Sequence, residues 1–346
     1  MQLPREVLIG RNVTRSVGDT LTRLGFRGPA LIVSGHQVKP IAADTVVESL
    51  QAAGMKTATI LVDNSTTEQV SKVETEIRSL KPDIVVGVGG GKDIDVAKLS
   101  SMKASTRFVS VPTAASHDGI ASPLVSMKGL DRPYSYVAHA PIAIIADISI
   151  IAKSPYRLVA AGCGDVIAKY TAVRDWKLAH RIKNEYYGDY AAELALMSSR
   201  LIIKNATAIR TISESGVRTL VEALISCGVA MSIAGTSRPC SGAEHLFSHA
   251  LSMTAPNPAL HGEQCGVGTI MCAYLHGANW QLIQDVLHKI GAPTNAKELG
   301  IEPEHVVKAL TMAHSIRPER YTILGESGLT KEAAERVATL TGVVDQ

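Results

Sequence analysis

The chain has 346 residues, enough for about two domains of ordinary size. It carries 35 lysines and arginines against 32 aspartates and glutamates, and the net charge of +3 offers no concentrated basic face for nucleic acid. Hydrophobic residues make up 46% and charged residues 19%, so a buried core is expected and extensive disorder is excluded.

Membrane and secretion signals are not expected in this sequence. The longest apolar run, residues 140–152, contains Pro141, Asp147 and Ser149 and falls short of the roughly 20 residues of a membrane span. The first residues lack the apolar region of a secretion signal. The five cysteines are scattered without a C-x-x-C pair, which disfavours a disulfide framework or a thiolate zinc site. We therefore expect a cytoplasmic protein with no nucleic-acid partner and no membrane span.

The first part of the chain alternates apolar runs with helical patterns. The expected strands are 31–34, 57–62, 83–88 and 107–111, and the expected helices are 40–53, 67–80 and 93–100. Strands that alternate with helices predict a parallel sheet with helices on both faces. The strands are continuous apolar runs, which fits burial on both faces.

The pattern changes after Thr113. Two short antiparallel strands, 122–127 and 134–139, and an apolar strand at 142–146 are expected. From about residue 154 the chain is expected to be almost entirely helical, with helices at 164–180, 187–205, 217–234, 242–254 and 261–278. We place the domain boundary near residues 150–155.

A glycine-rich loop, residues 87–93, follows one expected strand and precedes a helix. Glycines let a backbone approach a phosphate, and a helix N-terminus supplies amide donors. The spacing excludes a P-loop, because Val86 and Asp93 occupy the places of its first glycine and its Ser/Thr. The usual dinucleotide pattern also fits poorly, because Ile94 replaces its third glycine and the loop follows the third strand. A phosphate site and a tight turn both stay open.

Asp63 closes the second expected strand. An acid at this position could accept a hydrogen bond from a ribose hydroxyl, or it could form an Asx turn with the residues after it. Ser65 and Thr66 could tolerate a ribose phosphate instead, so the choice between NADH and NADPH stays open.

His245 and His249 are four residues apart in a helical stretch and share one helix face. The zinc motif H-E-x-x-H is absent, because Leu246 follows His245. His261 begins the next expected helix, and Asp165 lies on another. Two imidazoles from adjacent helices and one carboxylate make a three-ligand zinc site with an open fourth position. Ordinary, partly buried polar residues are the alternative.

Together these motifs resemble the polyol dehydrogenase and dehydroquinate synthase-like superfamily. The resemblance rests on residues 89–95, 112–119 and 164–165, on the helix with His245 and His249, and on 261–263. Within the superfamily, residues 116–123 are most similar to the sn-glycerol-1-phosphate dehydrogenases, archaeal enzymes that set the stereochemistry of the lipid backbone. The resemblance covers nearly the whole chain, from about Pro4 to about Gly325.

The resemblance implies a dehydroquinate synthase-like fold of the α/β class. A Rossmann-like dinucleotide-binding domain would span 1–153, and a helical metal- and substrate-binding domain would span 154–346. The implied zinc ligands are Asp165, His245 and His261, and the implied substrate contacts and catalytic residues are Asp118, Asp165 and His249. The cofactor residues expected, with Asp63, are Gly89, Gly90, Gly91, Lys92, Asp93, Ile94, Asp95, Thr113, Ser116 and Ser122.

At three positions the sequence differs from other branches of this superfamily, and these differences bear on the expected metal site and substrate. Lys169 stands where iron-dependent alcohol dehydrogenases have a histidine, which favours a three-ligand zinc site. Asp165 stands where dehydroquinate synthases have a glutamate. Residues 116–118 read Ser-His-Asp where glycerol dehydrogenases usually have Ser-Thr-Asp, which favours a phosphorylated substrate.

The resemblance thus implies zinc-dependent reduction of dihydroxyacetone phosphate to sn-glycerol 1-phosphate with NAD(P)H, for archaeal-type membrane phospholipid biosynthesis. A homo-oligomer is expected. The alternatives are a glycerol dehydrogenase acting on a non-phosphorylated polyol, a dehydroquinate synthase-like lyase that recycles NAD, and a non-catalytic nucleotide-binding module. Lys169, Arg174 and Lys204 are candidate donors to a substrate phosphate, although each could be a solvated surface charge. The proton relay is assigned to His249 or a metal-bound water.

Overall fold

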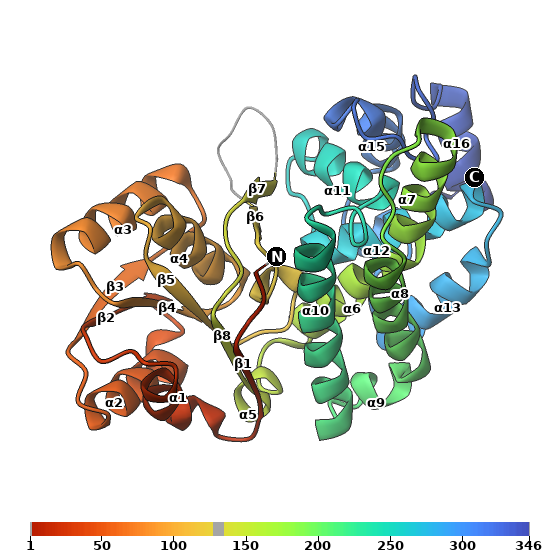
Figure 1. The fold of residues 1–346 in the computed structure, drawn as a ribbon. Coiled ribbons are helices and arrows are strands. Elements are labelled where there is room, and N and C mark those ends of the chain that lie inside the picture. Colours follow the sequence, from red (N-terminus) through yellow and green to blue (C-terminus); the bar gives the residue numbers. More distant parts are fainter. Residues whose placement is uncertain (1, 127–134, 346) are drawn as a thin grey trace. The chain divides into compact units, whose positions relative to one another are not determined.

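The computed structural model describes residues 2–126 and 135–345 (Figure 1). The chain forms two compact units, Met1–Tyr156 and Arg157–Gln346. The division lies close to the boundary expected near residues 150–155.

The first unit contains a six-stranded parallel sheet in the order β1-β8-β5-β4-β2-β3. Its strands are β1 (Glu6–Gly10), β2 (Ala30–Gly35), β3 (Thr57–Val62), β4 (Ile84–Gly89), β5 (Arg107–Pro112) and β8 (Ala143–Asp147). Every residue of β2 and β4 is buried, as expected for central strands covered on both faces. The predicted parallel α/β fold is confirmed.

Helices cover both faces of this sheet (Figure 1). On one face Leu21 and Leu50 join Ile32 in one core, and on the other Val73 and Ile94 join the second core. The helices are α1 (Val17–Arg23), α2 (Asp44–Ala52), α3 (Thr67–Leu80), α4 (Gly91–Lys103) and α5 (Ile148–Ile151), with short turns η1 (Val13–Ser16), η2 (Lys39–Ala43) and η3 (Asp118–Ile120). The expected helix at 40–53 begins with the π-helical turn η2.

Strand β1 was not expected from the sequence. It pairs in parallel with β8 at the sheet edge, and none of its residues is fully buried, so it lacks the continuous apolar pattern of the other strands. The two short strands β6 (Leu124–Ser126) and β7 (Ser135–Val137) pair antiparallel, as expected. Met127 and Tyr134, at the ends of the expected strands, lie outside the described residues.

The strand order reverses around β2. Strand β3 lies on one side of β2 and β4 on the other, so the chain goes from β2 to β3 on one side and then crosses back to β4 on the other. In parallel α/β sheets this switch point opens a crevice at the carboxyl ends of the strands, where ligands bind. Strands β2 and β4 end at Gly35 and Gly89. The fold therefore brings the glycine loop to the place where a nucleotide would be expected.

Helices are the only regular elements among the described residues of the second unit, as predicted. Its helices are α6 (Tyr156–Ile167), α7 (Lys169–Lys183), α8 (Asp189–Lys204), α9 (Ala206–Arg210), α10 (Glu214–Ala234), α11 (Ala243–Thr254), α12 (His261–Leu275), α13 (Trp280–Ile290), α14 (Ala296–Leu299), α15 (Pro303–Ile316) and α16 (Lys331–Leu340). The expected single helix at 164–180 is wrong, because the chain breaks into α6 and α7 at Ala168. Ala168 keeps helical dihedral angles (φ −54°, ψ −26°), so the break is a local change of hydrogen bonding that composition does not signal.

Helix α10 is long and apolar enough to cross a membrane by length and composition alone. Of its apolar window, 61% is buried inside the fold. The core helix of a soluble protein passes the same test, so this helix is weak evidence for a membrane span.

Candidate metal and cofactor sites

Two glycines bring the backbones of α6 and α12 into direct contact. A Cβ on Gly164 would lie 2.2 Å from the carbonyl oxygen of Gly262, and a Cβ on Gly262 would lie 1.9 Å from that of Ala161. Only a hydrogen atom fits at either position. Asp165 follows the first glycine and His261 precedes the second, so the contact brings these two side chains together.

Four potential metal ligands converge in the second unit. The ligand atoms of Asp165, His245, His261 and Cys265 lie within 4.8 Å of one another. Asp165 is 1% exposed, His245 6% and Cys265 0%. The structure thus brings together the three side chains expected to bind zinc, and it adds a cysteine that sequence reasoning did not include. Their role as ligands stays a prediction.

The two imidazoles are oriented by hydrogen bonds from their Nδ1 atoms. His245 Nδ1 donates to the Glu244 carboxylate at 2.8 Å. Ser248 Oγ donates to Gln264 Oε1 at 3.0 Å and lies 3.0 Å from His261 Nδ1, so this hydroxyl is left to accept the Nδ1 proton. With the Nδ1 atoms held in this way, both Nε2 atoms remain to bind a metal, which is the arrangement that outer-shell partners usually impose. Burial lowers the pKa of both rings, but Cys265 and Asp165 outweigh it and raise the pKa, so a metal would take the place of a proton on Nε2.

The charges of the cluster favour metal binding. Burial opposes ionisation of Asp165, but Lys169, at 2.9 Å, and His245 hold its pKa well below the usual value. Burial likewise opposes ionisation of Cys265, but the neighbouring charges of His245 and His261 outweigh it and lower the thiol pKa to about 6. The cluster can therefore present anionic donors at neutral pH, which a divalent cation would neutralise.

The donor set fits a divalent metal of the zinc class. For bond lengths near 2.0–2.1 Å and tetrahedral angles, neighbouring nitrogen and oxygen ligands lie about 3.3–3.4 Å apart. His245 Nε2 and Asp165 Oδ1 are 3.4 Å apart. Carboxylate and imidazole donors suit zinc and several other transition metals.

His249 lies beside this cluster. Its ring is 8% exposed and stacks on His261, with ring centroids 5.8 Å apart and planes at 29°. Burial, then the charges of His261 and His245, hold the pKa of His249 well below its usual value. Arg317 and Arg320 act in the same direction. His249 is therefore neutral at physiological pH and surrounded by positive charge.

In the first unit, the glycine loop has one position left open. A Cβ on Gly89 would lie 2.1 Å from Asp93 Oδ2, and one on Gly91 would lie 1.8 Å from His117 Nε2. A side chain at either position would therefore have to displace Asp93 or His117. A Cβ on Gly90 meets nothing within 4 Å, so the protein's own packing leaves this position unfilled. An open backbone at the N-terminus of α4 suits a bound phosphate.

The charged side chains of the glycine loop form hydrogen bonds to the backbone of the loop and of the neighbouring strand end. Asp93 accepts the Gly90 N–H at 3.1 Å and caps α4, and burial raises the pKa of this carboxyl to about 6. Lys92 Nζ donates to the Asp63 carbonyl at 2.8 Å. The Asp63 carboxylate is exposed and lies 3.5 Å from His36 Nε2. Asp63 and Lys92 thus lie together at the carboxyl ends of β3 and β4. Their role in binding the cofactor stays a prediction.

Buried Lys98 holds the segment after β5. Its Nζ donates to the carbonyls of Gly119 and Leu124 at 2.6 and 2.8 Å. Asp95 lies 3.6 Å from the same ammonium and accepts a backbone N–H from Ser126. Ser122 is also buried and bonds locally, with its Oγ 3.3 Å from the Leu124 carbonyl.

The remaining predicted cofactor and substrate residues differ in exposure. Ser116 and Asp118 are half-buried, whereas Ile94 is buried in the core. The Thr113 N–H donates to the Gly89 carbonyl at 2.9 Å, which joins the segment after β5 to the glycine loop. The cofactor assignments of Ile94, Asp95 and Ser122 stay predictions, since the observed contacts of these side chains are with the protein.

Sequence reasoning missed four contributing residues: Lys98, Glu244, Ser248 and Cys265. Two carried a usable signal, because Glu244 directly precedes His245 and Cys265 follows His261 by one helical turn. The others act through contacts that only the tertiary fold creates.

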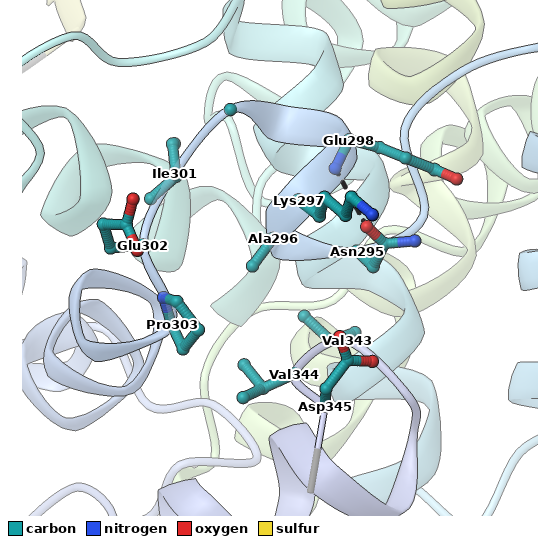
Figure 2. Close-up of a pocket in the computed structure, with 11 residues that line it drawn as sticks. Asn295, Ala296, Lys297, Glu298, Ile301, Glu302, Pro303, Val343, Val344 and Asp345 are labelled. Carbon is teal, nitrogen blue, oxygen red and sulfur yellow. Dashed lines mark hydrogen bonds between the residues drawn. The ribbon is translucent and has the colours of Figure 1, made fainter.

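A separate surface pocket of about 840 Å³ lies near the end of the chain (Figure 2). It is formed by α14, the start of α15 and residues Val343–Asp345. Asn295 Oδ1 accepts the Glu298 N–H there at 2.9 Å and caps α14. The residues that line this pocket include none of the predicted site residues.

Comparison with solved structures identifies the fold. Glycerol dehydrogenase from Schizosaccharomyces pombe matches with a TM-score of 0.81 at 19% identity, over 99% of this chain and 89% of that one. A probable glycerol dehydrogenase from Sinorhizobium meliloti matches with a TM-score of 0.77 at 20% identity, over 98% and 96%. The iron-containing alcohol dehydrogenase family model matches residues 8–155. The fold is that of dehydrogenases with a Rossmann-like unit followed by a helical unit.

Curated relatives that match over the whole of this chain identify its family. The glycerol-1-phosphate dehydrogenase (NAD(P)+) of Methanosarcina mazei is 54% identical over 100% of this chain and 97% of its own. That of Pyrococcus furiosus is 55% identical over 99% of both chains. The chain belongs to the glycerol-1-phosphate dehydrogenase family, as the resemblance of its motifs implied.

Proposed function

We propose that this chain reduces dihydroxyacetone phosphate to sn-glycerol 1-phosphate with NADH or NADPH, and that it needs zinc to do so. One observation carries the proposal: the carboxylate of Asp165 and two hydrogen-bonded imidazoles, His245 and His261, converge within 4.8 Å. Identity of 54–55% to glycerol-1-phosphate dehydrogenases over the full length supports the substrate. Supply of archaeal-type phospholipid backbones is the role that this product implies.

Zinc is favoured among the divalent metals by the donor set. Lys169 occupies the position where iron-dependent relatives carry a histidine, and its ammonium bonds to Asp165 at 2.9 Å. A lysine so placed cannot add a third imidazole as a fourth ligand. Two imidazoles and one carboxylate are a common catalytic zinc set.

The chain's own residues hold and orient the reactants. When bound, zinc supplies a Lewis acid for the ketone and the nicotinamide supplies the hydride. Asp165, His245 and His261 would hold the metal, while Glu244 and Ser248 fix the two rings. The open backbone at Gly90 and the N-terminus of α4 would hold the cofactor pyrophosphate.

His249 would move the proton. The product alcohol needs one proton more than the hydride brings, and a neutral imidazole can donate its N–H and recover a proton through its second nitrogen. The depressed pKa of His249 keeps the ring in this neutral form. Asp118 would contact a substrate hydroxyl.

Positive charge around His249 favours a phosphorylated substrate over a neutral polyol. Arg317 and Arg320 lie near enough to lower its pKa through their charge. Among the cations expected from the sequence, Lys169 bonds to Asp165 and Arg174 lies 3.8 Å over the Tyr170 ring. A positive field of this kind attracts anionic substrates.

Oxidation of NADH and of NADPH with dihydroxyacetone phosphate or dihydroxyacetone tests the proposal. We expect kcat/KM to be higher for the phosphate ester by on the order of 10²–10⁴-fold, because two charge-assisted hydrogen bonds of about 1.5–3 kcal/mol each would contribute about 3–6 kcal/mol. Chelation should abolish the activity, and added zinc should restore it. Equal or greater activity with dihydroxyacetone would identify a glycerol dehydrogenase instead. Absence of steady oxidation with either substrate would favour a lyase or a non-catalytic module.

We also propose, from the family resemblance, a homo-oligomeric cytoplasmic protein whose partners are small molecules. Light scattering of the purified protein would measure the assembly directly, and a mass equal to one chain would contradict it.

A further inference from the structure

Cys265 shares the geometry of the expected zinc ligands. It lies one helical turn after His261 on α12, and its Sγ is 3.5 Å from His261 Nε2. It is fully buried, and its Sγ is within 4.8 Å of the ligand atoms of Asp165 and His245. The thiol therefore faces the same point as the three expected ligands.

The distances match metal–thiolate coordination. With Zn–S near 2.3 Å, Zn–N near 2.0–2.1 Å and tetrahedral angles, sulfur and nitrogen ligands lie about 3.5–3.6 Å apart. The observed separation of Cys265 Sγ and His261 Nε2, 3.5 Å, equals this value. The separation of His245 Nε2 and Asp165 Oδ1 matches its own expected value equally well.

We propose that Cys265 is a fourth, sulfur ligand of the divalent metal in the substrate-free protein. This inference rests on the proposed metal site and extends it by one donor. When the metal enters, a metal–sulfur bond forms at the Cys265 thiolate, and the protons that the neighbouring imidazoles hold in the metal-free cluster pass to the solvent. Thiolate is a soft ligand that favours zinc and cobalt over manganese and magnesium. Cys265 therefore sets the metal preference of the site.

Cobalt provides a readout that does not depend on activity. A Co²⁺ ion bound by a thiolate has a sulfur-to-metal charge-transfer band in the near ultraviolet, whereas one bound only by nitrogen and oxygen does not. We would load the full chain with Co²⁺, measure its stoichiometry, and compare the wild type with Cys265→Ser and Cys265→Ala. Cys272→Ser is a matched control, because Cys272 lies on the same helix, is equally buried and is not one of the converging donors.

We expect the band in the wild type and in Cys272→Ser, and its loss in both Cys265 variants with cobalt still bound. Loss of an outer-shell partner typically lowers metal affinity by about 10–100-fold, and loss of a ligand should cost no less. We therefore expect the Zn²⁺ affinity of the Cys265 variants to fall by about 100-fold, with a smaller change in the Mn²⁺ affinity. Wild-type protein that binds one Co²⁺ without the band would overturn the role of Cys265 and leave the proposed function intact. Wild-type protein that binds no Co²⁺ or Zn²⁺ would overturn both. The wild-type spectrum keeps the test decisive even if a variant fails to fold.

Discussion

His249 lies against His261, yet it is not among the four donors that converge on the expected metal position. Substitution of a substrate contact should lower kcat/KM and leave the zinc content unchanged, whereas substitution of a metal ligand should lower the zinc content. His249→Ala should lower kcat/KM by on the order of 100-fold and leave the zinc content unchanged, because it removes a proton donor and no ligand.

His245→Ala is the matched comparison for this test, since it lies one turn away on the same face and should lose zinc. Zinc stoichiometry and kcat/KM would be measured on both variants. Loss of zinc from His249→Ala, or near-normal kinetics, would contradict the assignment.

His139 should make the stability of the protein depend on pH. Its ring stacks on Phe108 and lies 2.9 Å from Ser101 Oγ, and burial, aided by the charges of Lys98 and Arg107, lowers its pKa to about 4. The unfolded chain then binds a proton between about pH 6.5 and pH 4 that the folded chain does not bind. This group's contribution to stability is therefore complete above pH 6.5 and is lost as the pH falls toward 4.

His139→Gln cannot titrate and should show a shallower loss of stability over the same range. The measurement is the free energy of unfolding in urea for both proteins at several pH values. Acid effects of other groups are common to both, so the difference isolates His139. Curves that run parallel from pH 7 to pH 4 would show that this ring does not titrate as described.

Single site residues could be predicted from the sequence where they belong to a recognisable motif. Asp165, His245 and His261 were found through motifs that recur in a family, and the structure brings all three together. Cys265 follows His261 by one helical turn, but scattered cysteines disfavour a thiolate zinc site, and only the folded structure shows that Asp165 and His245 lie beside it.

Among the structural elements, the glycine loop offers the sharpest test. Gly90→Val places a branched side chain where the protein itself leaves open space, so the fold should tolerate it. The same side chain would block the approach of a pyrophosphate to the N-terminus of α4. We expect the KM for NADH to rise far more than that for the substrate, at an unchanged thermal midpoint. An unchanged cofactor KM in the folded variant would show that the loop is only a turn.

The elements themselves were predictable where burial is continuous. Strands β2 and β4 are buried along their whole length, and their apolar runs indicated them correctly. Strand β1 is partly exposed at an edge and escaped detection. The break at Ala168 also escaped, because alanine favours helix and only the packed structure shifts the hydrogen bonds there.

For the molecule as a whole, the change from alternating strands and helices to helices alone indicated two parts. Each compact unit holds one candidate site: the glycine loop in the first, and the carboxylate–imidazole cluster in the second. Composition could not indicate the substrate, since net charge does not report the local field around His249.

The configuration of the product tests the central proposal most directly. Dihydroxyacetone phosphate would be reduced with NADH or NADPH, and the glycerol phosphate formed would be offered to an enzyme specific for the sn-3 isomer. We expect stoichiometric oxidation of the cofactor. We also expect the product to be sn-glycerol 1-phosphate, which this second enzyme does not convert. Formation of sn-glycerol 3-phosphate, or of no glycerol phosphate at all, would contradict the proposal.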